Sequence, residues 1–207
     1  MNSHEVRRQW ADRSGEYSPA YYAHYGPDGS SESVRATLAR FLDRDASILE
    51  LGCSSGRHLS HLYDHGFENL TGIEVNDAAF EVMRETYPEV AAAGTFFPEA
   101  IEDVVGEFED GRFDAVYSVE TLQHIHPDAE WVFAELARIT DDLVVTVENE
   151  GDRERDGNGD PEVNYVNDEF PLYYRDWNRV FTDLGLVEVD VSQGSRDTAR
   201  TFRQSRD

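Results

Sequence analysis

The fold is decided by residues 47–62, which read Ser-Ile-Leu-Glu-Leu-Gly-Cys-Ser-Ser-Gly-Arg-His-Leu-Ser-His-Leu. The apolar run 48–51 predicts a short buried strand, and Gly52 and Gly56 bracket the turn that follows it. Apolar residues at helical spacing then continue to about residue 65. The stretch therefore predicts a strand, a glycine-rich turn and a helix N-terminus, which together present backbone N–H groups and a positive dipole end to a ligand.

Strands and helices are predicted to alternate along the rest of the chain. Further strands are expected at 70–74, 90–97, 113–119, 143–147, 186–191 and 199–203. Helices are expected at 5–12, 19–24, 31–43, 56–65, 78–87, 98–105, 128–139 and 175–185. This alternation predicts an α/β fold: a doubly wound, Rossmann-like, mostly parallel sheet of seven strands with helices on both faces.

The charge of the chain is strongly negative. It has 43 acidic and 18 basic residues, a net charge of −25, and every basic residue is arginine. Such a charge repels itself in a compact chain, and concentrated salt screens it because the Debye length falls to about 3 Å at 1 M. We therefore predict a halophilic, salt-adapted acidic protein. The acids are spread along the whole chain, which argues against one acidic face for a basic partner.

Several classes of partner are disfavoured by composition. No basic cluster exceeds two residues, so nucleic acid is not the expected partner, although salt screening weakens that objection for RNA. No run approaches the roughly 18 apolar residues of a membrane span, and residues 1–10 lack the apolar core of a signal peptide. We expect a soluble, cytoplasmic monomer or homodimer. The single cysteine, Cys53, excludes an internal disulfide and a multi-cysteine metal site, and no metal is expected.

The carboxyl ends of the predicted strands bring together residues that carry chemistry. In an open α/β sheet the ligand lies beyond these ends, near the switch in strand order. The first strand ends at Glu50 and Gly52, the second at Glu74 and the fourth at Ser118. Glu74 lies 18 residues after Gly56, where an acid is placed to accept both hydroxyls of a ribose. These segments should meet in one cleft.

The glycine spacing separates two classes of cofactor. A dinucleotide loop needs the pattern G-x-G-x-x-G to hold a pyrophosphate, whereas three residues separate Gly52 from Gly56 here. Glu50 would repel a phosphate but suits the ammonium and sulfonium of S-adenosylmethionine, and Arg57 is placed to pair with the methionine carboxylate. A glycine turn alone often only connects a strand to a helix. With Glu74 and the strand order, it predicts a site for S-adenosylmethionine.

These motifs resemble those of the class I S-adenosylmethionine-dependent methyltransferases. The matching segments are 48–56 (motif I), 72–74 with the motif II acid Glu74, and 113–125. The resemblance is strong over residues 45–148, and it extends only in general outline to the C-terminal residues that follow. It implies transfer of a methyl group to an acceptor, with S-adenosylhomocysteine as product. The motifs do not identify the acceptor, for which a small molecule is our expectation.

The resemblance implies cofactor contacts along the strand ends. Gly52 and its neighbours would contact the methionine moiety, Glu74 the ribose, and Asn76 would flank the adenosine. Glu99 is the candidate for the adenine amino group. The full predicted set is Glu50, Gly52, Cys53, Ser54, Gly56, Arg57, Glu74, Asn76, Glu99, Ala100, Ile101, Ser118 and Val119.

The acceptor side is predicted from the loop after the fourth strand and from the N-terminus. An oxygen or ammonium nitrogen acceptor needs a base, for which His124 is the candidate, although it could instead pack or cap the next helix. Glu120 and His126 are candidate substrate contacts. Four tyrosines could roof the site, surround a cationic acceptor or simply pack as a lid. These are Tyr17, Tyr21, Tyr22 and Tyr25.

We expect one domain over 1–207, since this length can bury a full core. Its parts are an aromatic lid (1–30), the cofactor-binding core (31–148), an acidic loop (149–170) and a closing helix with strands (171–207). Two other functions fit parts of the pattern. A non-catalytic S-adenosylmethionine or nucleotide-binding module would lack an acceptor pocket, and an NAD-dependent oxidoreductase is disfavoured by the glycine spacing and Glu50.

Overall fold

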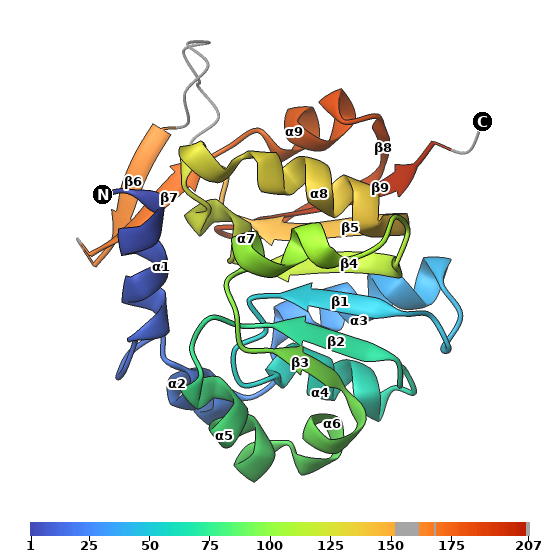
Figure 1. Ribbon diagram of the computed structural model, residues 1–207. Helices are drawn as coiled ribbons and strands as arrows, with labels where there is room; N and C mark the ends of the chain where they lie inside the picture. The colour runs from blue at the N-terminus through green and yellow to red at the C-terminus, as the bar shows by residue number, and fades with distance from the viewer. Residues whose placement is uncertain (152–161, 168, 206–207) are drawn as a thin grey trace.

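The computed structural model describes residues 1–151, 162–167 and 169–205. A seven-stranded sheet has the order β3-β2-β1-β4-β5-β9-β8 (Figure 1). Its strands are β1 (Ile48–Leu51), β2 (Leu70–Ile73), β3 (Thr95–Phe97), β4 (Phe113–Val119), β5 (Thr140–Glu148), β8 (Leu186–Gln193) and β9 (Thr198–Gln204). Strands β1 to β5 are parallel, and β9 runs antiparallel to β5 and β8. The predicted doubly wound, Rossmann-like, mostly parallel sheet is confirmed.

Helices cover both faces of the sheet. One face packs on α3 (Gly29–Phe41), α4 (Arg57–Asp64), α5 (Ala78–Thr86) and α6 (Pro88–Ala93). The other packs on α7 (Ile101–Val104), α8 (Trp131–Ile139) and α9 (Trp177–Asp183). Because successive strand side chains point to opposite faces, Ile48 of β1 enters the first core and Leu49 the second.

Three predicted elements are shorter than expected. The strand expected at 90–97 is only β3, because Pro88 begins α6 and a proline is tolerated in the first turn of a helix. The helix expected at 98–105 is α7 followed by the 3₁₀ turn η1 (Val105–Glu107). The helix expected at 128–139 begins as the 3₁₀ turn η3 (Pro127–Ala129) and continues as α8.

In the N-terminal segment, α1 (Ser3–Ala11) lies beside a β-hairpin at one end of the sheet, whereas α2 (Pro19–Tyr25) lies against α5 (Figure 1). The hairpin pairs β6 (Glu162–Val166) with β7 (Phe170–Tyr174). The acidic loop expected at 149–170 is therefore wrong in its second half, which forms β6 and begins β7. Residues 152–161, part of the predicted acidic loop, lie outside the described residues.

None of the helices within the described ranges is long and apolar enough to cross a membrane.

Candidate functional site

A cavity opens beyond the carboxyl ends of β1, β2 and β4, on either side of the switch in strand order. It is the place where an open α/β sheet binds its ligand. Of the predicted cofactor set, those on its wall are Gly52, Cys53, Ser54, Arg57, Glu74, Asn76, Glu99, Ala100, Ile101 and Val119. Of the predicted acceptor set, those on its wall are Tyr17, Tyr22, Glu120 and His124.

The turn after β1 brings bare backbone to the cavity. Gly52 has a φ of +66°, and a Cβ there would lie 2.6 Å from Cγ2 of Thr121. Ser54 also adopts a left-handed conformation, with a φ of +48°. A side chain larger than hydrogen at position 52 would therefore strain the backbone and push against the loop after β4. Glycine is therefore required at position 52 for two reasons, its positive φ and its close approach to Thr121.

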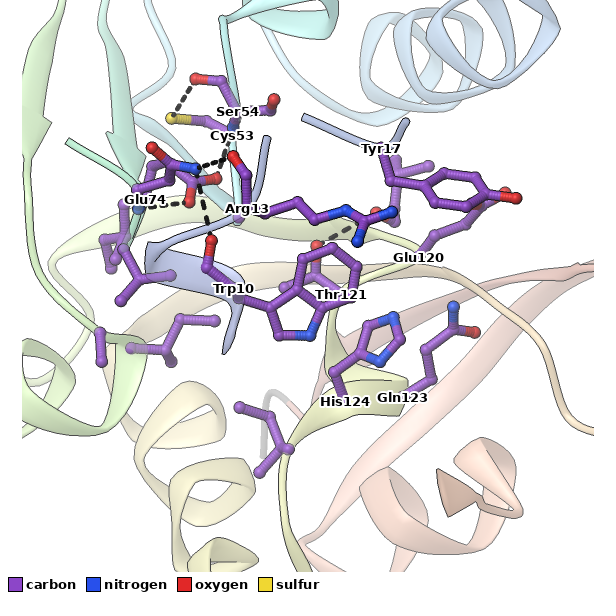
Figure 2. A pocket seen from close by; sticks show the side chains of 18 of the residues that line it. Trp10, Arg13, Tyr17, Cys53, Ser54, Glu74, Glu120, Thr121, Gln123 and His124 are labelled. Atoms are coloured by element: carbon purple, nitrogen blue, oxygen red, sulfur yellow. Dashed lines mark hydrogen bonds between the residues drawn. The ribbon is translucent and has the colours of Figure 1, made fainter. Parts of the chain in front are cut away.

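Glu74 follows β2 directly and faces the cavity (Figure 2). Its Oε2 accepts from the backbone N–H of Ser54 at 2.9 Å, and its Oε1 from that of Asn76 at 2.8 Å. An ionised carboxylate has about four lone-pair positions, so two remain for ligand hydroxyls. Burial raises the pKa of Glu74, while the backbone N–H groups of Asn76, Ser54 and Val75 lower it. The carboxylate thus ties the ends of β1 and β2 together and keeps acceptor capacity toward the cavity.

Asn76 holds the N-terminal segment over this carboxylate. Its Nδ2 donates to the backbone oxygens of Arg13 at 3.0 Å and Trp10 at 3.3 Å, and its Oδ1 accepts from Ala78 N–H at 3.1 Å. Neither Trp10 nor Arg13 was predicted as a site residue, yet both line the cavity. Figure 2 shows Trp10 beside His124 and Arg13 extending toward Tyr17.

Arg13 also joins the segment to the hairpin. Its Nη1 donates to Oε2 of Glu169 at 3.0 Å, and its guanidinium lies 4.7 Å from the ring centre of Phe170. Trp10 packs on the same ring, at 4.3 Å between ring centres. The cavity is therefore covered by α1 and β7, two elements distant in sequence. Leu172 of β7 and Val166 of β6 complete that side.

His124 lies in the 3₁₀ turn η2 (Leu122–His124), which follows β4. Its Nδ1 bonds to the backbone oxygen of Pro171 at 2.9 Å, and because a carbonyl only accepts, Nδ1 carries the proton. Burial lowers the pKa of His124 to about 4, so the ring is neutral at pH 7 and Nε2 is the basic nitrogen. Its ring centre is 4.6 Å from that of Trp10. The unprotonated Nε2 can accept a proton from a ligand, although the lowered pKa makes it a weak base, and the same packing also explains a structural histidine.

Arg57 and Glu120, two charged residues of the wall, have charged partners in the protein. Arg57 bonds to Oδ2 of Asp28 at 2.7 Å and lies over the ring of Tyr22, 4.9 Å from its centre. Glu120 forms an ion pair with Arg196. Burial raises the pKa of Tyr22 to about 12, so its hydroxyl stays protonated.

Six predicted residues lie outside the wall. Glu50 is buried beside Tyr117, and burial raises the pKa of Glu50 well above its usual range, which favours the neutral acid. Ser118 is buried and donates to Glu148, and Nε2 of His126 donates to the oxygen of Met1 at 3.0 Å. The others outside the wall are Gly56, Tyr21 and Tyr25. Gly56 precedes α4 with a φ of +81°, and Tyr25 is 63% exposed.

The comparisons with known proteins agree with this geometry. Residues 49–142 match the family model of a methyltransferase domain. Over 58 residues the chain is 36% identical to EEF1A lysine methyltransferase 2 of Danio rerio, covering 28% of this chain and 25% of that protein. Over 126 residues it is 25% identical to the O-methyltransferase resE of Aspergillus sclerotiorum, covering 56% and 47%. The chain thus spans a quarter to about half of these relatives.

A solved structure shares nearly the whole fold. It is the 1,6-didemethyltoxoflavin-N1-methyltransferase of Burkholderia thailandensis, with 1,6-didemethyltoxoflavin and S-adenosylhomocysteine bound. The TM-score is 0.68 at 16% identity, covering 99% of this chain and 84% of that one. The sheet order, the cavity at the strand ends and the match over residues 49–142 agree: the chain has the fold of the class I S-adenosylmethionine-dependent methyltransferases, and this stretch is similar to a methyltransferase domain.

Proposed function

We propose that this protein transfers the methyl group of S-adenosylmethionine to a small-molecule acceptor. The observation that carries the proposal is Glu74, a half-buried carboxylate at the end of β2 that keeps acceptor capacity toward the cavity. A ribose diol is a matching donor pair for such a carboxylate.

The residues on the β1–β2 side of the cavity fit S-adenosylmethionine. Gly52 allows the ligand to approach the backbone, and Ile101 and Val119 give apolar surface on either side. Arg57 has five N–H donors, so its bond to Asp28 leaves others for a carboxylate. When bound there, S-adenosylmethionine would supply the activated methyl group.

The other side of the cavity fits the acceptor. Trp10, Leu172 and His124 form a wall made by α1, β7 and the turn η2. Nε2 of His124 would take a proton from an acceptor hydroxyl or N–H group, while the bond to Pro171 fixes the ring. A wall built partly by the N-terminal segment leaves a covered cavity, which favours a small acceptor over the side chain of a folded protein.

A titration tests the cofactor part. We expect S-adenosylhomocysteine to bind the wild-type protein in 2 M KCl, and Glu74→Gln to weaken binding roughly tenfold or more, because one charge-assisted acceptor is lost. Glu81→Gln, at an exposed position of α5, is the matched control and should bind as the wild type does. Binding of NAD in place of S-adenosylhomocysteine would overturn the proposal.

Methyl transfer tests the acceptor part. The protein is incubated with S-adenosylmethionine carrying a radiolabelled methyl group and with a cell extract separated into small molecules, protein and RNA. We expect label in the small-molecule fraction, and a loss of roughly 10²-fold or more in rate for His124→Gln, the usual contribution of a general base. Label in protein alone would indicate a protein methyltransferase, and no label anywhere a binding module.

We also infer that the protein works in concentrated salt. Its net charge of −25 over 207 residues, with no lysine, supports this. Counterions at molar concentration would screen the self-repulsion of such a surface.

A further inference from the structure

Glu148, the last residue of β5, has no exposed surface and does not line the cavity. Its Oε1 accepts from the backbone N–H groups of Leu122 at 3.1 Å and Thr121 at 3.3 Å, and also from the hydroxyl of Ser118. Its Oε2 accepts from the N–H of Gln123 at 3.2 Å. One carboxylate therefore receives three consecutive backbone N–H groups at the start of the turn η2.

Arg175 occupies the other end of the same turn. It lies between β7 and α9, with only 4% of its side chain exposed. Its Nη2 donates to the backbone oxygen of Ile125, the residue after η2, at 2.7 Å, and its Nε donates to Oε1 of Glu130 at 3.0 Å. An anion at the N-terminal N–H groups and a cation at the C-terminal carbonyl both match the dipole of a helical turn.

The turn held in this way carries the residues that face the acceptor side. Gln123 and His124 both line the cavity, and Oε1 of Gln123 accepts from the N–H of Asn149 at 2.8 Å. The ring of His124 is also held by the hydrogen bond from its Nδ1 to the backbone oxygen of Pro171. The position of Nε2 of His124 therefore depends on the backbone of η2. Glu148 and Arg175 hold that backbone without lining the cavity themselves.

We propose that Glu148 and Arg175 are positioning residues that hold η2 so that His124 meets the acceptor. The role of His124 in this proposal rests on the proposed function, whereas the clamping of the turn does not. A carboxylate accepts through both oxygens, whereas a glutamine there would point an NH₂ group at backbone N–H donors. A misplacement of about 1 Å at a reacting group can cost roughly 10²-fold in rate.

The charge of Glu148 makes this clamp sensitive to pH. Burial raises the pKa of Glu148 to about 7, against the opposing effect of its four hydrogen-bond donors. The charged group that faces it is Arg175, from the β7–α9 connection. A protonated carboxyl gives up one acceptor position to an O–H donor, so the clamp should loosen as the pH falls through about 7.

The test compares Glu148→Gln with Thr146→Val in the full chain. Thr146 lies on the same strand, two residues earlier, and its buried hydroxyl has no hydrogen-bond partner within the described residues, so Thr146→Val is the matched control. Hydrogen exchange is measured by NMR at pH 6, 7 and 8, after correction for intrinsic rates. We expect Glu148→Gln to speed exchange of the Thr121–Gln123 amides about tenfold, as for loss of about 1.4 kcal/mol, without affecting the amides of β1.

Two further readouts separate positioning from stability. Binding of S-adenosylhomocysteine should be unchanged in Glu148→Gln, and with the labelled extract the rate at saturating S-adenosylmethionine should fall while its KM stays constant. The pH dependence of exchange at Thr121–Gln123 should be present in the wild type and absent in Glu148→Gln. If Glu148→Gln does not fold, Arg175→Lys, which keeps the charge and loses the guanidinium fork, should loosen the same turn.

The outcomes can be told apart. Equal exchange and equal rates for Glu148→Gln and Thr146→Val would overturn the clamp, and so would faster exchange along the whole chain. If the wild type transfers no methyl group, the proposed function falls, while exchange at Thr121–Gln123 still decides whether Glu148 holds the turn.

Discussion

The side-chain amide of Asn76 donates to the backbone oxygen of Arg13 at 3.0 Å, across 63 residues of sequence. The backbone N–H of the same Asn76 donates to Glu74 at 2.8 Å. One residue therefore joins the carboxylate at the end of β2 to the segment that covers the cavity. We therefore expect ligand binding at Glu74 to be coupled to closure of the N-terminal segment over the cavity.

Asn76→Asp should release the N-terminal segment. The aspartate keeps an oxygen for the N–H of Ala78 but loses the two bonds to Trp10 and Arg13, each of about 1 kcal/mol. Because about 2 kcal/mol is lost in total, we expect trypsin to cleave after Arg7, Arg8 and Arg13 roughly 30-fold faster in this variant. Asn69→Asp adds the same charge at an exposed position and should be cleaved at the wild-type rate. Equal cleavage of the two variants would mean that other contacts hold the segment.

Gly52→Ala should both destabilise the protein and block the site. Alanine at positive φ costs roughly 1–2 kcal/mol, and the added Cβ would also push against Thr121. Gly185 has a φ of +93° with nothing within 4 Å of the position that an added Cβ would take, so Gly185→Ala carries the strain without the contact. Denaturant unfolding and S-adenosylhomocysteine titration should show loss of stability in both variants but loss of binding only in Gly52→Ala.

His58 should make the protein sensitive to acid. Burial, with Arg57 nearby, lowers the pKa of His58 to about 3 from an ordinary value of 6.5. Above pH 6.5 the imidazole is neutral in both states. Below it the unfolded chain takes up the proton first, so the free energy of unfolding falls by up to about 1.4 kcal/mol per pH unit down to about pH 3.

His58→Gln removes this titration. The difference in unfolding free energy between wild type and variant should change with that slope between pH 6.5 and 5, whereas the exposed His4→Gln should run parallel to the wild type. A constant difference for His58→Gln would show that the folded protein takes up the proton at His58 as readily as the unfolded chain does. In the wild type, Nδ1 of His58 lies 2.7 Å from Oγ of Ser31. The glutamine of His58→Gln can form a hydrogen bond with the same hydroxyl.

Salt should raise the melting temperature. Screening of a net charge of −25 favours the compact state, so we expect Tm to rise steadily from 0.1 to 2 M KCl. The triple variant Glu81→Gln, Glu85→Gln, Glu89→Gln removes three exposed charges from α5 and α6 and should show a smaller rise. The same rise in both proteins would mean that surface repulsion is not the cause.

The parts of the site that depend on local sequence could be predicted. The strand, turn and helix of 48–64 form from neighbours, and Glu74 follows β2 as expected. Arg13 could not be found, because its place depends on an amide more than 60 residues away. Glu50 was expected at the ligand, but the alternation along β1 sends it to the buried face that Ile48 shares.

Two further features had a signal in the sequence. The run Val163-Asn-Tyr-Val166 and the apolar residues from Phe170 onward are typical of strands, but the acidic residues before them suggested one long loop. Glu148 is an acid at the end of a strand, as Glu74 is, yet its role depends on the path of the chain after β4. The sequence pattern predicts where an acidic residue lies on the sheet, but not which backbone N–H groups its carboxylate will contact.

Cys53 is the chain's only cysteine, and it lies on the cavity wall with 1% of its surface exposed. Burial raises its thiol pKa well above the usual range, so a closed site presents an unreactive thiol. Its sulfur packs beside Gly72 of β2 in the buried core, so maleimides and disulfide reagents should modify the protein only as fast as this packing opens. The rate of Cys53 modification, followed by mass spectrometry without an introduced label, should therefore report local opening of the turn after β1, and a ligand bound against that turn should slow it.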